Sequence, residues 1–142
     1  MTQRTPAEEE LRKLSVEMRY LEQTADILQQ RITMINTAIA DLTYANTTLD
    51  SVENEQKNTE MLVPIGGSSY VKVSLADTDK VIVGLGSGVS VEKTLPDAKV
   101  TLKERLDELE KNMISAQQQF NQVVERISSG RNKLESLLAD SR

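Results

Sequence analysis

The chain has 142 residues, a net charge of −5 and 38% apolar residues, but only 3% aromatic residues. This length suits one domain, and the scarcity of aromatic side chains disfavours a compact single-chain core. The acidic balance disfavours a nucleic-acid binder, which would show a basic patch. The lack of cysteine excludes disulfides and thiol chemistry.

The first predicted element is a helix over about residues 6–57. Thr5, Pro6 and Glu8 match an N-cap, a first helical residue and a capping box. Behind them apolar residues step by three and four, which is the a/d pattern of a coiled coil. A helix of roughly 50 residues would be about 75 Å long. The a/d positions are Leu11, Leu14, Met18, Leu21, Ala25, Leu28, Ile32, Ile35, Ile39, Leu42, Asn46 and Leu49.

Asn46 is the one polar residue in this a/d series. A buried asparagine at an a position can fix the register of a coiled coil at some cost in stability. The alternative is that Asn46 lies where the coil frays into the next segment. We favour the fraying explanation.

Residues 61–95 form the next predicted segment, which alternates with a period of two and holds most of the glycines. Glycine-rich and aspartate-rich connections mark turns between strands. Pro64 lacks an amide donor, which places its strand at an edge or a bend. The pattern predicts two β-hairpins in series, with strands at Met61–Ile65, Ser69–Leu75, Lys80–Leu85 and Val89–Thr94.

The glycines of residues 84–88 allow two interpretations. A nucleotide-binding loop would need them to open a helix after a strand. Here another strand pattern follows, and no lysine stands at the spacing of a phosphate-binding loop. We therefore interpret these glycines as a hairpin turn with positive φ.

The hairpins carry an apolar face that needs a cover. About 35 residues of β structure with one apolar face are not stable alone in water. We expect that the flanking coil cannot cover this sheet, because its own seam is used helix against helix. The sheet should therefore pair with the same segment of another subunit. The predicted assembly platform comprises Val63, Ile65, Val71, Val73, Leu75, Val81, Val83, Leu85, Val89 and Val91.

A second helix is predicted over about residues 96–139. It should pair antiparallel with the first helix, so that Leu49 lies near Leu102 and both chain ends meet at one tip. Gly130 follows two serines, so we expect the end of this helix to be loose or kinked. Its a/d positions are Leu102, Leu106, Leu109, Met113, Ala116, Phe120, Val123, Ile127, Gly130, Leu134 and Leu137.

The tip holds more apolar residues than a two-helix seam can bury. Exposed apolar surface often marks an interaction site, and the alternative is ordinary fraying of a coil end. The sequence alone leaves both open. The candidate binding residues at the tip are Leu11, Leu14, Val16, Met18, Ile127, Leu134, Leu137 and Leu138.

Catalytic chemistry is not expected. The chain has neither histidine nor cysteine, which disfavours zinc sites and the usual catalytic bases and nucleophiles. We predict no catalytic, metal or cofactor site and no enzyme activity.

No apolar stretch is long enough to span a bilayer, and the N-terminus lacks the core of a signal peptide. We expect a cytoplasmic protein without nucleic-acid or membrane partners. Outward carboxylates such as Glu17, Glu22, Glu104, Asp107 and Glu108 should be solvated or should form interhelical pairs.

Between the helices, LVPIGGSSYVKVSL and DTDKVIVGLGSGVSVEKTLPDA resemble the prefoldin family. The likeness covers essentially the whole chain, and residues 62–98 are its specific part. Two hairpins, instead of one, resemble the alpha class, most closely its archaeal form. The resemblance implies a single subunit over residues 1–142. It is mainly α, with a long antiparallel two-helix coiled coil whose two inserted hairpins join an inter-subunit β-barrel.

The resemblance also implies a function. Prefoldins are ATP-independent holdase chaperones of the cytosol that assemble as hexamers, typically two alpha with four beta subunits. By that likeness the partners are beta subunits, a second alpha subunit through the β platform, unfolded proteins and a group II chaperonin. The resemblance further implies that apolar residues at the tips of the coiled coils bind the unfolded protein.

Two other functions remain open from the sequence. The chain could be a structural coiled-coil assembly or filament-forming subunit that binds no client. A helix lying on a membrane surface would need a wider apolar face and a lysine-rich polar face. The narrow seam and acidic charge disfavour that function.

Overall fold

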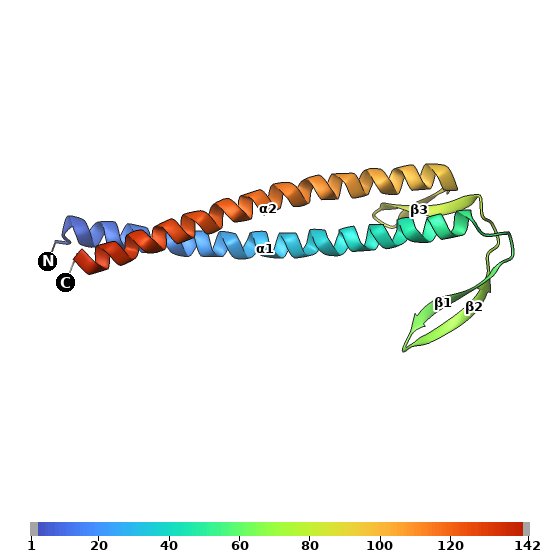
Figure 1. Cartoon of the computed structure of the whole chain (residues 1–142), viewed down its shortest axis with the longest axis horizontal. Helices are drawn as coiled ribbons and strands as arrows, with labels where there is room; N and C mark the ends of the chain where they lie inside the picture. Colours follow the sequence, from blue (N-terminus) through green and yellow to red (C-terminus); the bar gives the residue numbers. More distant parts are fainter. Residues whose placement is uncertain (1–2, 141–142) are drawn as a thin grey trace. The chain divides into compact units, whose positions relative to one another are not determined.

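The computed structural model describes residues 3–140 (Figure 1). It contains two long helices with two hairpins between them, which confirms the predicted mainly α fold. The chain divides into two compact units, described separately below: a terminal unit of residues 1–37 and 110–142, and a hairpin unit of residues 38–109. The elements are α1 Pro6–Glu53, β1 Glu60–Gly66, β2 Ser69–Ser74, β3 Lys80–Gly86, β4 Val89–Thr94 and α2 Leu95–Asp140.

Both helices begin at capped residues. The Thr5 backbone N–H donates to Glu8 Oε2 at 3.2 Å, and the Glu8 N–H donates to Thr5 Oγ1 at 3.2 Å. These two bonds are the predicted capping box, and they satisfy N–H groups that have no partner inside the helix. At α2, Thr94 Oγ1 accepts from the Asp97 N–H at 3.3 Å.

The predicted end of the first helix at residue 57 is wrong, because α1 ends at Glu53. Asn58 takes a positive φ of 69°, a conformation that asparagine tolerates better than most residues. Its N–H donates to the Leu75 carbonyl at 2.7 Å, and the Thr59 N–H donates to the Gln56 carbonyl at 3.2 Å. The polar residues after Glu53 therefore form a turn that returns the chain toward β2.

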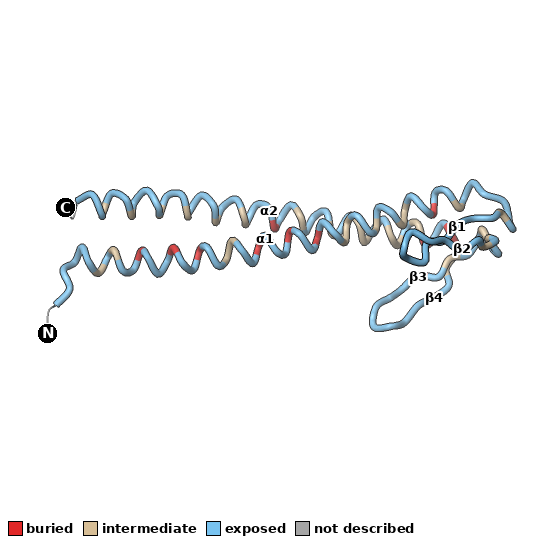
Figure 2. The backbone as a smooth tube through the Cα atoms, turned by 90° about the horizontal axis from the view of Figure 1, so that it is seen from below, coloured by how far each residue is buried: buried red, intermediate tan, exposed pale blue. Residues whose placement is uncertain are grey.

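The predicted a/d positions of both helices are all buried or half-buried, and burial recurs at regular intervals along each helix (Figure 2). In the terminal unit Leu14, Met18 and Leu21 form a buried cluster with residues from the far end of α2. In the hairpin unit Leu49 and Leu102 belong to one cluster. The antiparallel pairing predicted for the two helices is therefore confirmed within each unit.

Each hairpin is a separate two-stranded antiparallel sheet, β1–β2 and β3–β4. In the first turn Gly67 and Ser68 have φ of 58° and 59°, and in the second Ser87 and Gly88 have φ of 54° and 78°. Two successive residues with positive φ are what a tight hairpin turn requires. The glycines of residues 84–88 thus shape a turn between two strands, and the nucleotide-loop alternative is not supported.

The two hairpins repeat one pattern with an offset of twenty residues. The pair Glu60↔Ser74 of the first corresponds to Lys80↔Thr94 of the second, and both registers shift just before the turn. The repeat includes the flanking bonds, because the Leu75 N–H donates to the Thr59 carbonyl at 2.9 Å and the Leu95 N–H donates to the Asp79 carbonyl at 2.7 Å.

The repeated hairpins differ in what they contact. Val83 of β3 is only 4% exposed and packs with Leu49 and Ala98 at the end of the helix seam. Its counterpart Val63 in β1 is 40% exposed, and β1–β2 projects away from the helix ends in Figure 1. The expectation that the coil cannot cover the sheet is therefore wrong for β3–β4. The small side chain of Ala98 leaves room for a valine where the seam ends.

The expectation of a loose or kinked end in the second helix is also wrong. α2 continues through Gly130 to Asp140 without interruption. A side chain at Gly130 would overlap the sulfur of Met18, whose Cγ and Cε lie 3.6 Å from the position of that missing Cβ. The glycine therefore gives Met18 its place in the seam, and this packing offsets the low helix propensity of glycine.

Val83→Ala should lower the free energy of unfolding by about 2 kcal/mol, because it removes two buried methyl groups. Val63→Ala is the matched control at the equivalent position of the repeat. Denaturant unfolding with hydrogen exchange of the β3–β4 amides measures both. Equal losses of stability at low protein concentration would contradict the difference in packing.

Gly130→Ala should couple to Met18. Alone, the substitution requires the Met18 thioether to shift from its place in the seam. In a Met18→Ala background it should instead stabilise the helix by about 1 kcal/mol, the usual gain of alanine over glycine. A double-mutant cycle of unfolding free energies should give a coupling of roughly 1 kcal/mol or more. Additive effects would show that the two residues do not share a site.

Candidate binding surfaces

The candidate tip residues divide into three groups by exposure. Leu14 and Met18 are buried in the seam of the terminal unit. Leu11, Ile127, Leu134 and Leu137 are half-buried. Val16 is 56% exposed and Leu138 is 46% exposed. Most of the predicted tip therefore builds the coil, and Val16 and Leu138 are the members that offer apolar surface. The binding role of the whole set stays a prediction.

Two interhelical ion pairs flank the centre of this tip. Lys133 Nζ lies 3.5 Å from Glu10 Oε1, and Arg126 Nη2 lies 3.3 Å from Glu17 Oε1. Glu17 is thus an interhelical partner, which is one of the two roles predicted for the outward carboxylates. The pairs are exposed and add little stability. Beside them an open groove of about 390 Å³ is lined by Leu14, Glu17, Glu125, Arg126, Ser129, Gly130 and Lys133.

Charge is unevenly distributed between the units. The terminal unit holds equal numbers of acidic and basic residues, so the entire net charge of −5 belongs to residues 38–109. A surface without net charge neither attracts nor repels a partner by the sign of its charge. Net charge therefore gives the terminal unit as a whole no preference for acidic or basic partners.

The predicted platform residues are also unequal. Val83 is buried against the helices, while Val73, Leu75, Val81 and Val91 are half-buried. The pairs Met61↔Val73 and Val63↔Val71 place four apolar side chains on one face of β1–β2. An isolated hairpin with such a face is marginal in water. The exposed platform residues are Val63, Ile65, Val71, Leu85 and Val89.

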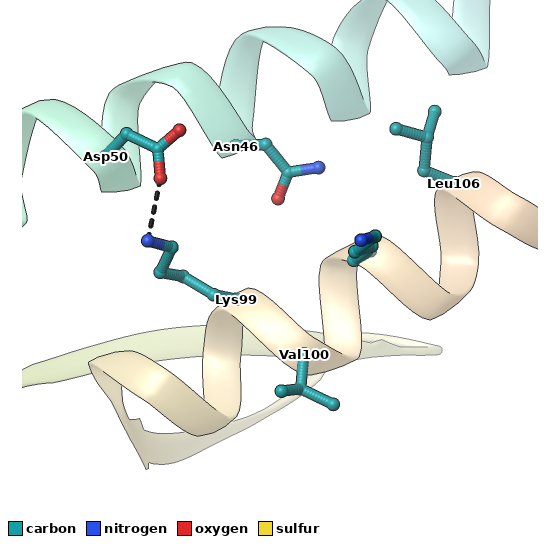
Figure 3. Close-up of a pocket in the computed structure, with 6 residues that line it drawn as sticks. Asn46, Asp50, Lys99, Val100 and Leu106 are labelled. Atoms are coloured by element: carbon teal, nitrogen blue, oxygen red, sulfur yellow. Dashed lines mark ion pairs between the residues drawn. The ribbon is translucent and has the colours of Figure 1, made fainter.

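Lys99 joins the two helices beside the hairpins, a contact that the sequence prediction missed. Its Nζ lies 2.8 Å from Asp50 Oδ1 and 2.6 Å from Glu53 Oε2 (Figure 3 shows the Asp50 pair). The pKa of Lys99 is raised above its ordinary value of 10.5, mainly by the hydrogen bond to Asp50 and next by the hydrogen bond to Glu53. The sequence did contain a signal for this contact, namely opposite charges near the end of α1 and the start of α2. The antiparallel register of the two helices was needed to show that these charges pair.

Asn46 is half-buried in α1 and lines a cavity of about 330 Å³ with Asp50, Lys99, Val100, Lys103 and Leu106. Figure 3 shows its amide directed between the two helices. The fraying explanation for Asn46 is wrong, because Leu49, closer to the end of α1, is buried again. Asn46 therefore lies within the seam, between half-buried Leu42 and buried Leu49, which is where the register-fixing explanation places it.

Within residues 3–140, no group of three or more acidic side chains is arranged to hold a metal ion. No helix in this part of the chain is long and apolar enough to cross a bilayer.

Together the fold and its surfaces define a class of protein: an antiparallel two-helix coiled coil with two hairpins between the helices and uncovered apolar strands. The family model described as prefoldin subunit matches residues 21–140. The chain belongs to the prefoldin family. The resemblance to the alpha class is confirmed by curated relatives that are themselves prefoldin alpha subunits.

One of these relatives, from Methanococcoides burtonii, is 32% identical over 87% of this chain and 89% of its own length. Another, from Pyrococcus horikoshii, is 34% identical over 83% of this chain and 80% of its own length. Both matches extend well beyond the hairpins into the helices.

Two solved structures share the fold. A chain of the filamentous prefoldin from Methanocaldococcus jannaschii has a TM-score of 0.68 and 22% identity, over 79% of this chain and 93% of that one. The prefoldin beta subunit from Thermococcus strain KS-1 has a TM-score of 0.60 and 15% identity, over 96% of both chains.

Lys99→Met should destabilise the folded chain in a pH-dependent way. Because the pKa of Lys99 is raised in the folded state, its contribution is complete below the ordinary value of 10.5 and is lost as the pH rises through the raised pKa. The difference in Tm between wild type and variant should therefore be constant near neutral pH and shrink in strong alkali. Lys103→Met, on the same helix, is the control. A difference that stays constant to the highest pH would contradict this role.

Proposed function

We propose that this chain is the alpha subunit of a prefoldin chaperone that holds non-native proteins without ATP and delivers them to a group II chaperonin. The observation that carries the proposal is exposed apolar surface in a unit without net charge. Val16 and Leu138 are exposed and belong to the terminal unit, which holds equal numbers of acidic and basic residues. Such a surface suits clients that share only exposed apolar residues.

Assembly would use the hairpins. The exposed apolar face of β1–β2 supports pairing with other subunits, since Val63 and Val71 on that face are 40% and 44% exposed. We propose beta subunits as partners, in an arrangement of two alpha with four beta subunits. The two alpha subunits would contact each other through the β platform. The relatives named above and the fold shared with a beta subunit support this proposal. We expect the assembly in the cytoplasm.

Holding would be multivalent. Each tip offers only a small apolar area, and several tips on one platform can contact one client at once. The effective concentration of the second and later contacts makes the total affinity far higher than that of one tip. Release then needs only competition for the weak individual contacts, and no catalytic step is proposed.

Val16→Ser with Leu138→Ser should weaken suppression of client aggregation several-fold, because avidity multiplies the loss at each tip. Ile114→Ser, on the same unit and also exposed, is the matched control and should keep full activity. Light scattering of a denatured client with the assembled protein measures the effect. Deletion of residues 1–18 and 128–142 should abolish protection, and full protection by that deletion would refute the tip model.

The alternative is a structural or filament-forming subunit that binds no client. The filamentous structure from M. jannaschii shows that the same fold occurs in filaments. Under this alternative the full-length assembly would not protect a client at all. Native mass of the chain, alone and with a beta subunit, separates closed assemblies from filaments.

A further inference from the structure

A row of exposed apolar residues runs along α1 outside the helix seam. Tyr20, Ile27 and Met34 are 67%, 65% and 73% exposed, and they recur every seven residues. All three occupy the heptad position two residues after an a position, which faces away from the partner helix. We call these three residues the outer stripe; none of them belongs to the tip set.

The same position of α2 is polar. In the terminal unit it holds Ser115, Gln122, Ser129 and Ser136, and all four are exposed. The two helices belong to the same coiled coil and face the same solvent. Solvent exposure alone therefore does not explain why this position is apolar on α1 and polar on α2. A row of exposed apolar residues at one heptad position of one helix only is a candidate interaction surface.

The spacing of the outer stripe points to a helical partner. Seven residues of helix rise by about 10.5 Å, and a second helix lying alongside presents one apolar residue at the same interval. An extended chain advances about 3.3 Å per residue and alternates faces, so its third residue along points the wrong way. A heptad-spaced stripe therefore matches an amphipathic helix better than an extended segment.

The flanks of the outer stripe indicate the charge of that partner. Beside the stripe lie Glu17, which is paired with Arg126, and three charged residues that form no ion pair within residues 3–140: Arg19, Asp26 and Arg31. These three unpaired residues carry a positive balance, which complements carboxylates on a partner. Thr24, also on the flank, already donates its hydroxyl to the Tyr20 carbonyl at 2.9 Å. A partner that covers Thr24 would therefore not leave its hydroxyl donor without a hydrogen bond.

We propose that the outer stripe binds amphipathic helical segments with acidic flanks in non-native clients. This inference rests on the proposed holding function and adds a second kind of contact. The tip takes apolar side chains of any unfolded segment, and the outer stripe takes segments that have kept or regained helix. One chain could then hold partly folded clients along its arm as well as at its end.

A three-heptad synthetic peptide with leucine at a and d and glutamate at e and g tests the proposal. It should bind the full-length chain in fluorescence anisotropy. Ile27→Ser with Met34→Ser should weaken that binding about tenfold, the usual effect of removing interface anchors. Ile114→Ser, which removes a similar exposed side chain from α2, should leave it unchanged. Arg19→Glu with Arg31→Glu should reverse the preference toward a peptide with lysine at e and g.

Several results would overturn the proposal. They are equal binding of a scrambled peptide of the same composition, unchanged binding by the Ile27/Met34 variant, or an equal loss in the Ile114 control.

Loss of self-association in the Ile27/Met34 variant would assign the stripe to a second copy of the chain. Binding of vesicles that the variant abolishes would assign it to a lipid surface. Aggregation suppression distinguishes failure of the proposed function, because an inactive assembly refutes holding altogether. Intact suppression with no peptide binding refutes only the stripe.

Discussion

The antiparallel a/d seam is the interaction on which the rest of this molecule depends. The chain has only 3% aromatic residues, and the buried apolar clusters of residues 3–140 lie along the helices and where β3 packs on them. Its buried residues are mostly seam residues, from Leu14 to Leu49 in α1 and at Ala116 in α2. A two-helix seam is narrow, so large apolar side chains outside it have no place within the chain. Those at the tip, on the outer stripe and on β1–β2 are therefore available to other molecules.

The seam also depends on a small residue of α2 at two places. In the hairpin unit it ends on Val83, which fits above Leu49 because Ala98 is small. In the terminal unit Gly130 has no side chain, and Met18 occupies the space. In both places a small residue on α2 accepts a larger apolar partner. At both places the larger residue is buried in the described structure, although the local composition suggested weakness.

The hairpins show how one repeated unit can serve two roles. Their registers match with an offset of twenty residues, yet only the second contributes a buried residue, Val83, to a cluster with the helices. The first keeps the equivalent apolar face open. We infer that β3–β4 holds the platform on its own coil and that β1–β2 is free to join other subunits.

The sequence by itself determined the helices, the seam register, the capping box at Thr5 and the two hairpins, because these depend on local periodicity and turn chemistry. In the candidate tip the heptad register already placed Leu14 and Met18 in the seam and Val16 outside it, whereas the exposure of each residue came from the structure. Only the tertiary structure decided that Met18 fills the space at Gly130, that Val83 is buried while Val63 is not, and that Lys99 joins Asp50 and Glu53. Each of these contacts brings together residues far apart in the chain, and their partners depend on the three-dimensional pairing of helices and hairpins.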